Sequence, residues 1–185
     1  MAAASDAFAE HGRETQMDDV AARAGLGVGT LYRHFATKEA LMVALVERRF
    51  EKILEAARHG LTREDAEPFE VFADVIRAGL EVAATDVTTQ NALMRVGDAI
   101  WLEVRPTLLE LRAATQVLID RAQQAGTMRG DISADDIPML LCGVSSTMSS
   151  GQWDWRRYLE LMLDGLRAAA TKTVPQPPLE RSATP

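Results

Sequence analysis

Side chains suited to a polyanionic partner gather in one short stretch of the chain, residues 28–38 (VGTLYRHFATK). If this stretch is helical, Leu31 and Phe35 lie four residues apart on the buried face, and Gly29 and Arg33 point the opposite way. The fork of an arginine can bond two acceptors of a guanine, and a glycine opposite the core lets the backbone approach the bases. The chemistry that this stretch predicts is contact with DNA.

Other side chains of the same stretch suit the walls of a DNA groove. Thr30, Tyr32 and His34 flank the arginine and are placed to meet phosphates, and Val28 is placed to touch a thymine methyl. Lys38, with the free amides at the start of its helix, forms an anion site for another phosphate. Tyrosine or histidine alone would equally well decorate a small helical bundle, so the prediction rests on the whole set.

Two short helices must position these side chains. Residues 17–24 (MDDVAARA) form the first, Gly25 and Gly27 suit a tight turn, and residues 28–35 form the second. This is the helix-turn-helix arrangement, whose second helix enters the major groove. Thr15 or a shifted start is expected to cap the first helix, since glutamine is a poor cap. The next helix, Lys38–Arg58, is capped by Thr37 and links this module to the rest of the chain.

At these residues the chain resembles the tetracycline-repressor (TetR) family of bacterial regulators. The resemblance covers only the first quarter of the chain and rests on these matching positions: Val20-Ala21, Ala24-Gly25, Gly29-Thr30-Leu31-Tyr32, His34-Phe35 and Lys38-Glu39-Ala40-Leu41. It implies a DNA-contacting role for Val28, Gly29, Thr30, Tyr32, Arg33, His34 and Lys38. Gly27 and Val28 stand where family members often have serine and a polar residue, so fewer hydrogen bonds are available at the front of the helix. The helix over residues 1–11 also looks clipped, so either the true start lies upstream or the basic arm's backbone contacts are lacking.

Composition and charge limit the class of protein. The chain has 185 residues, a net charge of −7 and 47% apolar residues, so a sizeable core is possible. Residues 20–38 contain Arg23, Arg33 and Lys38 and no acid, although three cations could equally be a solvated surface. No apolar run reaches the ~20 residues of a membrane span, and no leader pattern is present, which predicts a cytoplasmic protein away from membranes. The lone Cys142 is expected to be a small core residue.

The periodicity predicts an all-α chain, and the resemblance implies an N-terminal three-helix DNA-binding domain and a C-terminal helical domain. The expected domains are 1–45 for DNA binding, 46–171 for the ligand binding and dimerisation that the resemblance implies, and 172–185 as a disordered, proline-rich tail. Ser133 or Asp135 is expected to cap one of the C-terminal helices, and residues 99–102 read as an irregular apolar stretch. The C-terminal helices are expected over residues 68–84, 86–98, 106–125, 136–150 and 154–171.

Two further sites are expected in the C-terminal domain. As in such regulators, the middle helices could enclose an unidentified, largely apolar effector, although each lining residue reads equally well as plain core: Phe72, Ile76, Leu93, Met94, Ile100, Trp101, Leu111 and Thr115. The last two helices could pair with those of a second copy in a four-helix bundle, or be used within the monomer. The stripe expected in that homodimer is Leu140, Leu141, Val144, Met148, Trp155, Leu159, Met162, Leu163 and Leu166.

Other classes of protein have little support in the sequence. None of the three histidines shows metal-ligand spacing, Cys142 has no evident base, and neither a nucleophile elbow nor a P-loop is present. We therefore predict that the protein is not an enzyme and requires no cofactor. We expect a ligand-responsive regulator, a repressor, that binds a palindromic double-stranded operator as a dimer. The alternative is an all-α adaptor whose helix-turn-helix module binds protein instead of DNA.

Overall fold

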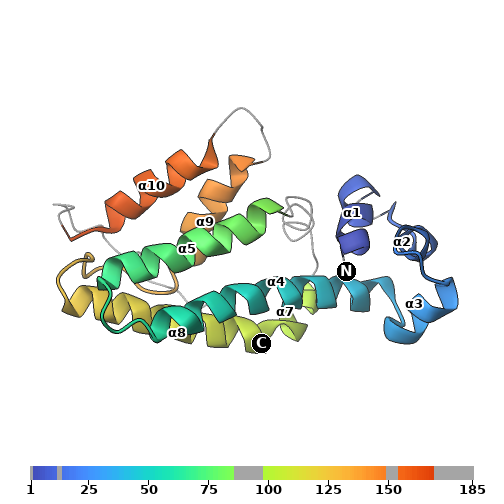
Figure 1. Cartoon of the computed structure of the whole chain (residues 1–185), viewed down its shortest axis with the longest axis horizontal. Coiled ribbons are helices and arrows are strands. Elements are labelled where there is room, and N and C mark those ends of the chain that lie inside the picture. The colour runs from blue at the N-terminus through green and yellow to red at the C-terminus, as the bar shows by residue number, and fades with distance from the viewer. Residues whose placement is uncertain (1, 12–13, 86–97, 149–153, 169–185) are drawn as a thin grey trace.

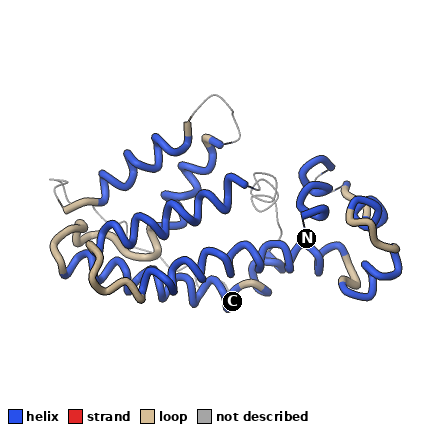
Figure 2. Tube along the Cα trace, viewed as in Figure 1, coloured by secondary structure: helices blue, strands red, loops and turns tan. Residues whose placement is uncertain are grey.

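The computed structural model describes residues 2–11, 14–85, 98–148 and 154–168, and these form helices and connections without a named strand (Figures 1 and 2). The all-α prediction is confirmed. Leu93, Met94 and the predicted tail, 172–185, lie outside the described residues. Residues 99–102, expected to be irregular, are helical. The helices are α1 (Ala2–His11), α2 (Met17–Arg23), α3 (Val28–His34), α4 (Lys38–Leu61), α5 (Pro68–Thr85), α7 (Asp98–Glu103), α8 (Arg105–Gln124), α9 (Ile137–Ser146) and α10 (Trp155–Leu166).

The first three helices and the start of α4 form a small module at one end of the molecule (Figure 1). The hydroxyl of Thr15 donates to the carbonyl of Ala7 at 3.1 Å, which ties α1 to the start of α2. Gln16 stands at the N-cap position of α2 without a capping bond from its side chain. The module has its own core, which consists of Ala4, Ala7, Phe8, Met17, Val20, Ala21, Leu31, Leu41 and Leu45.

A glycine sets the turn between α2 and α3. Gly25 has φ +65°, a left-handed conformation that costs glycine little and other residues more. Its amide donates to Ala22 at 3.1 Å, and the amide of Leu26 donates to Ala21 at 2.9 Å, the bond pattern of a Schellman motif. The turn therefore fixes the direction in which the chain leaves α2, and α3 begins at Val28.

Helix α4 spans both parts of the molecule (Figure 1). The hydroxyl of Thr37 accepts from the amide of Ala40 at 3.1 Å, so the predicted N-cap is confirmed. Near its other end, α4 crosses α5 closely at Gly60: a Cβ on Gly60 would lie 2.9 Å from Cγ2 of Val75. Between these ends, buried Val46 of α4 and Val104 form the centre of a small apolar cluster, which we call the junction cluster. The residues packed against that centre are Met42, Val43, Phe50, Ile100, Trp101 and Leu108.

The C-terminal domain is built around α5, whose start is capped by an acid. Both carboxylate oxygens of Glu67 accept backbone amides, from Phe69 and from Glu70, at 2.9 Å each. Partial burial raises the pKa of Glu67, but these amide bonds, together with a hydrogen bond of Thr127 and the charge of Arg167, outweigh it, so its pKa lies below the usual value. Beyond this cap, apolar residues on two sides of α5 are buried: Phe69, Val71, Phe72, Val75, Ile76, Leu80 and Ala83.

Three arginine–carboxylate pairs join α5 to α10. They are Glu70 with Arg167, Arg77 with Glu160, and Glu81 with Arg156. Because residue numbers rise along one helix as they fall along the other, the pairs define an antiparallel arrangement, which Figure 1 shows. We refer to these three pairs as the α5–α10 ladder.

The start of α9 differs from the prediction. Asp136, and not Ser133 or Asp135, stands at its N-cap, without a capping bond from its side chain. The Asp136 carboxylate instead accepts from the amide and hydroxyl of Ser133, at 2.8 and 3.0 Å. Asp135 pairs with Arg112 of α8, at 2.7 Å from Nη2. Each acid is therefore used to fix the loop ahead of the helix.

Candidate DNA-binding site

Helix α3 presents the face that its sequence predicts. Leu31 is buried and Phe35 is half-buried against the small core, while Gly29 and Arg33 are exposed. Gly27 is the N-cap residue with an extended backbone, and its carbonyl accepts from the amide of Thr30 at 2.9 Å. The structure thus brings these residues onto one solvent-facing helix: Val28, Gly29, Tyr32, Arg33 and His34 are exposed, and Thr30 is half-exposed.

Lys38 lies at the edge of this surface and has a structural contact. Its Nζ is 3.4 Å from the carbonyl oxygen of Thr15, which joins the start of α4 to the α1–α2 connection. The side chain is half-buried, so its ammonium is held close to one position. A cation fixed beside the exposed start of α4 is suitably placed for one phosphate.

Arg23, one of the three cations that the sequence places in the acid-free stretch, is paired with an acid in the structure. Arg23 forms an ion pair with Glu10 of α1, and this hydrogen bond and charge hold the pKa of the Glu10 carboxyl below its usual range. Glu10 lies thirteen residues before Arg23, outside the acid-free stretch. For Arg33, by contrast, no ion pair occurs with any described residue. Of the two arginines in this stretch, Arg33 is therefore the one whose charge is not paired with a described acid.

One apolar residue beside α3 was not among those predicted. Leu26 follows the Gly25 turn and is 45% exposed, next to Val28 at 38%. In a Schellman motif the residue at this position commonly packs back on the preceding helix, so its exposure is a departure from the usual pattern. Two exposed apolar side chains at the front of α3 suit contact with thymine methyl groups. In the sequence, the only indication of an apolar front to α3 was the absence of a polar residue at its first positions.

The predicted effector lining is divided between two cores. Phe72, Ile76 and Thr115 are buried and Leu111 is partly buried in the C-terminal core, and the Thr115 hydroxyl bonds the carbonyl of Leu111 at 2.8 Å. Ile100 and Trp101 instead belong to the junction cluster, where Trp101 packs on Phe50 at 6.3 Å between ring centroids. None of these residues lines the pocket of about 370 Å³ that the described residues form at the opposite end of α4.

The predicted dimer stripe is largely used inside the chain. Five of its members are buried in the C-terminal core, where a second copy cannot reach them: Val144, Trp155, Leu159, Leu163 and Leu166. Four are partly buried and packed against that core: Leu140, Leu141, Met148 and Met162. For the buried members this favours the alternative of use within the monomer, since periodicity reveals that a face is apolar but not which surface covers it. The outward faces of α9 and α10 carry Met139 and Leu161 instead, both exposed.

Among the described residues, no group of three or more histidine, cysteine, aspartate or glutamate side chains is placed to hold a metal ion. Cys142 is a half-buried free thiol. None of the described helices is both long and apolar enough to cross a bilayer.

Two family models match the chain. Residues 1–45 match the bacterial regulatory proteins of the tetR family, and residues 67–168 match the SbtR-like C-terminal domain of transcriptional regulators. The chain is also 27% identical over 129 residues to an uncharacterized HTH-type transcriptional regulator of Mycobacterium tuberculosis. That alignment covers 69% of this chain and 55% of the relative, so the chain spans about half the length of the curated relative.

Solved structures agree with these matches. A TetR transcription regulatory protein from Mycobacterium vanbaalenii is 34% identical, with a TM-score of 0.63 over 90% of this chain and 91% of its own. The regulator FadR from Bacillus subtilis, solved in complex with stearoyl-CoA, has a TM-score of 0.77 over 92% of this chain and 97% of its own. At 20% identity that second likeness shows a shared fold. The chain belongs to the TetR family of helix-turn-helix transcriptional regulators, which are not enzymes.

Proposed function

We propose that this regulator binds a palindromic double-stranded operator as a homodimer and represses transcription in the cytoplasm until a small molecule releases it. The observation that carries the proposal is the solvent-facing side of α3, where Arg33 and Gly29 lie opposite buried Leu31. Such a helix can enter a major groove without unfolding the module behind it.

The contacts divide into base reading and phosphate positioning. Arg33 is assigned to a guanine, and Val28 with Leu26 to thymine methyl groups. Thr30, Tyr32, His34 and Lys38 are assigned to phosphates, which fix the register of the helix without reading sequence. The apolar front of α3 makes methyl contacts a larger share of the readout than amide or hydroxyl contacts.

One such helix contacts few base pairs, so a second copy is required for specificity. Two recognition helices on successive major grooves must lie about 34–36 Å apart. We assign the dimer surface to the outward faces of α9 and α10. Met139 is 75% and Leu161 is 55% exposed, and a Cβ built on Gly143 or Gly165 would meet no described atom within 4 Å beyond its neighbours in its own helix. Small residues between exposed apolar ones permit close helix approach in a four-helix bundle.

An effector acts only if it binds the DNA-incompetent arrangement better than the competent one. The junction cluster lies on α4, which also belongs to the DNA-binding module, so a change in the packing of Phe50 on Trp101 is transmitted along one helix. The apolar effector that the sequence suggests is in keeping with the stearoyl-CoA held by the structurally similar FadR.

DNA binding is tested by a mobility shift on DNA from upstream of the protein's own gene, titrated at several salt concentrations. A DNA-binding regulator releases counterions from phosphates, so the logarithm of its binding constant falls linearly and steeply with the logarithm of the salt concentration. A scrambled duplex of equal length is the control. An adaptor that binds protein would shift neither duplex at any salt concentration, and that result would overturn the proposal.

The dimer surface is tested by sedimentation of Gly143→Arg beside the control Gly130→Arg. Both positions are exposed and have room for a side chain within the monomer, but only Gly143 lies on α9. We expect the wild type and the control to sediment as dimers and Gly143→Arg as a folded monomer with lost operator binding. A wild-type protein that sediments as a monomer would contradict the assignment.

A further inference from the structure

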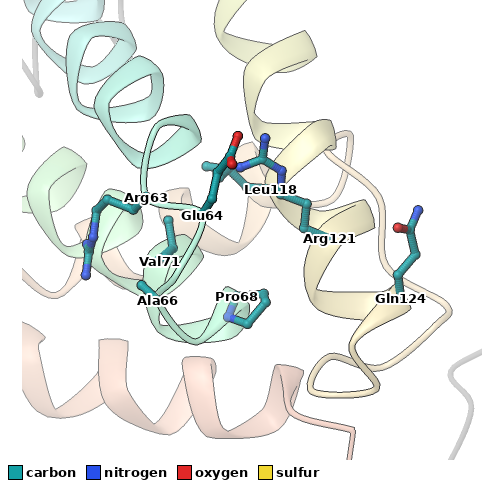
Figure 3. A pocket seen from close by; sticks show the side chains of 8 residues that line it. All are labelled: Arg63, Glu64, Ala66, Pro68, Val71, Leu118, Arg121 and Gln124. Carbon is teal, nitrogen blue, oxygen red and sulfur yellow. The ribbon is translucent and has the colours of Figure 1, made fainter.

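A pocket of about 370 Å³ is lined by the α4–α5 connection, α5 and α8 (Figure 3). It lies beside the end of α4 that is distant from the DNA-binding module (Figure 1). Its volume is in the range of small-molecule sites, ~300–1,000 Å³. Val71 of α5 and Leu118 of α8 form its apolar wall, both of them buried, and Ala66 and Pro68 continue that wall along the α4–α5 connection. Polar side chains at the rim complete the lining: Arg63, Glu64, Arg121 and Gln124.

The charged side chains at the rim differ in whether they are paired with other described residues. Arg63 is held by Asp74, at 2.8 Å between Nη1 and Oδ2, and in Figure 3 its guanidinium points away from the pocket. Arg121 is half-buried and is oriented by one bond, from Nη1 to the carbonyl of Leu61 at 2.8 Å. Its other donors have no acceptor among the described residues. One guanidinium is thus fixed at the rim with donors to spare.

Glu64 supplies the opposite charge. Its side chain is exposed and forms no ion pair with any residue in the described ranges, Arg121 included. Figure 3 shows the Glu64 and Arg121 side chains rising on the same side of the pocket, from the connection and from α8. A carboxylate and a guanidinium that share a rim without an ion pair between them can each bond one end of a molecule that carries both charges.

We propose that this pocket binds a small zwitterion, an α-amino acid with an apolar side chain. Its carboxylate bonds Arg121, its ammonium bonds Glu64, and its side chain lies against Val71 and Leu118. Charge-assisted hydrogen bonds at both ends give orientation, and the apolar wall gives contact area. This binding step does not depend on the proposed repressor activity, because the pocket can be filled whether or not DNA affinity changes.

The test is titration calorimetry of the full chain with L-leucine and L-phenylalanine as probes. The comparison compounds are 4-methylpentanoate, which lacks the ammonium, and 3-methylbutylamine, which lacks the carboxylate. We expect each amino acid to bind about tenfold more tightly than either single-charge compound, the effect of one charge-assisted bond at an exposed rim. Equal affinities for all compounds, or no binding of either amino acid up to about 10 mM, would overturn the proposal.

Two variants assign the binding to this pocket. Glu64→Gln should weaken L-leucine binding about tenfold and leave 4-methylpentanoate unchanged, because only the ammonium loses its partner. The matched control is Asp65→Asn, an adjacent exposed acid that does not line the pocket. Ala66→Trp, which fills the pocket from the connection, should abolish binding without loss of helical circular dichroism. Binding that survives Ala66→Trp, or that falls equally in the Asp65→Asn control, places the amino acid elsewhere.

Discussion

The guanidinium of Arg77 donates two parallel hydrogen bonds to the carboxylate of Glu160, from Nε to Oε1 at 2.8 Å and from Nη2 to Oε2 at 2.9 Å. Its remaining nitrogen reaches Asp74 at 3.2 Å and Glu70 at 3.3 Å. The hydrogen bond to Glu160 is the main reason that the pKa of Arg77 is raised, ahead of the opposing effect of its partial burial. This one residue centres the α5–α10 ladder and so positions the helix that carries the proposed dimer surface.

Removing that centre should loosen α10 measurably. Arg77→Met keeps the aliphatic stem but leaves the three carboxylates without their shared partner, so we expect a loss of about 1 kcal/mol in the free energy of unfolding. The control is Arg58→Met, which removes a single exposed pair with Glu110 and should cost at most about 0.5 kcal/mol. Urea denaturation measures both, and equal losses in the two variants would show that the ladder has no special role.

The pH dependence of stability follows from Glu160 in the same ladder. Hydrogen bonds from Arg77 hold the pKa of Glu160 below its ordinary value of 4.5, so the ionised form favours the folded state. That stability is present above the unfolded pKa and is lost as pH falls through the lower, folded pKa. Glu160→Gln should therefore be less stable than wild type at pH 7, and the difference should vanish in acid. Since Glu160 is 52% exposed, we expect a difference below about 1 kcal/mol. A difference that persists unchanged at pH 3 in thermal melts would argue against this origin.

Arg33 and Lys38 should affect DNA binding in different ways. Arg33→Ala should cost roughly 1–3 kcal/mol on the operator and relax sequence preference, because it removes a base contact. Lys38→Ala should weaken all duplexes alike and reduce the salt slope by about one, because it removes a phosphate contact. Competition binding with operator and scrambled DNA separates the two. Unchanged affinities for both duplexes in Arg33→Ala would exclude its assignment to a base.

Gly29 allows folding and DNA binding to be tested separately. Beyond its neighbours in α3, a Cβ on Gly29 would meet no described atom within 4 Å, and alanine is a better helix former than glycine by about 1 kcal/mol. We expect Gly29→Ala to melt at the same or a higher temperature and yet to bind operator about tenfold more weakly, since the methyl group separates the backbone from the bases. Full operator affinity in this variant would mean that the backbone of α3 does not approach the DNA.

Gly60 should be intolerant of the same change. Its Cβ would lie 2.9 Å from Val75 Cγ2 and 3.3 Å from Val71 Cγ1, so the valine side chains or the two helices would have to move. We expect Gly60→Ala to lose about 1–3 kcal/mol of stability, as overpacked cores do. Gly79→Ala is the matched control, because its nearest neighbour, Ile53, would be 3.4 Å away. If Gly79→Ala is destabilised as much as Gly60→Ala, the close crossing is not the cause.

Local features were predictable from the sequence because they depend on neighbouring residues. Helical spacing placed Leu31 inward and Arg33 outward, and the short side chain of Thr37 identified a cap, as the structure has them. The pairing of Arg23 with Glu10 was not predictable in this way. It depends on how α1 packs on α2, which no local pattern encodes.

The C-terminal domain was harder to predict for a related reason. An apolar stripe such as Trp155, Leu159 and Leu163 indicates that a helix face is covered, and the cover is equally well α5 or a second copy. The pocket was missed because its lining comes from a connection and two helices distant in the chain. Glu64 and Arg121 carry no motif that would associate them before the chain is folded.

Met42 packs at once against the core of the DNA-binding module and against the junction cluster. Methionine has an unbranched, flexible side chain, unlike the branched valines at the centre of the junction cluster. A small tilt of α4 can thus be absorbed by rotating one thioether while both apolar clusters stay closed. In the proposed dimer, Met42 would let α4 tilt and so change the spacing of the two α3 helices while both apolar clusters stay closed.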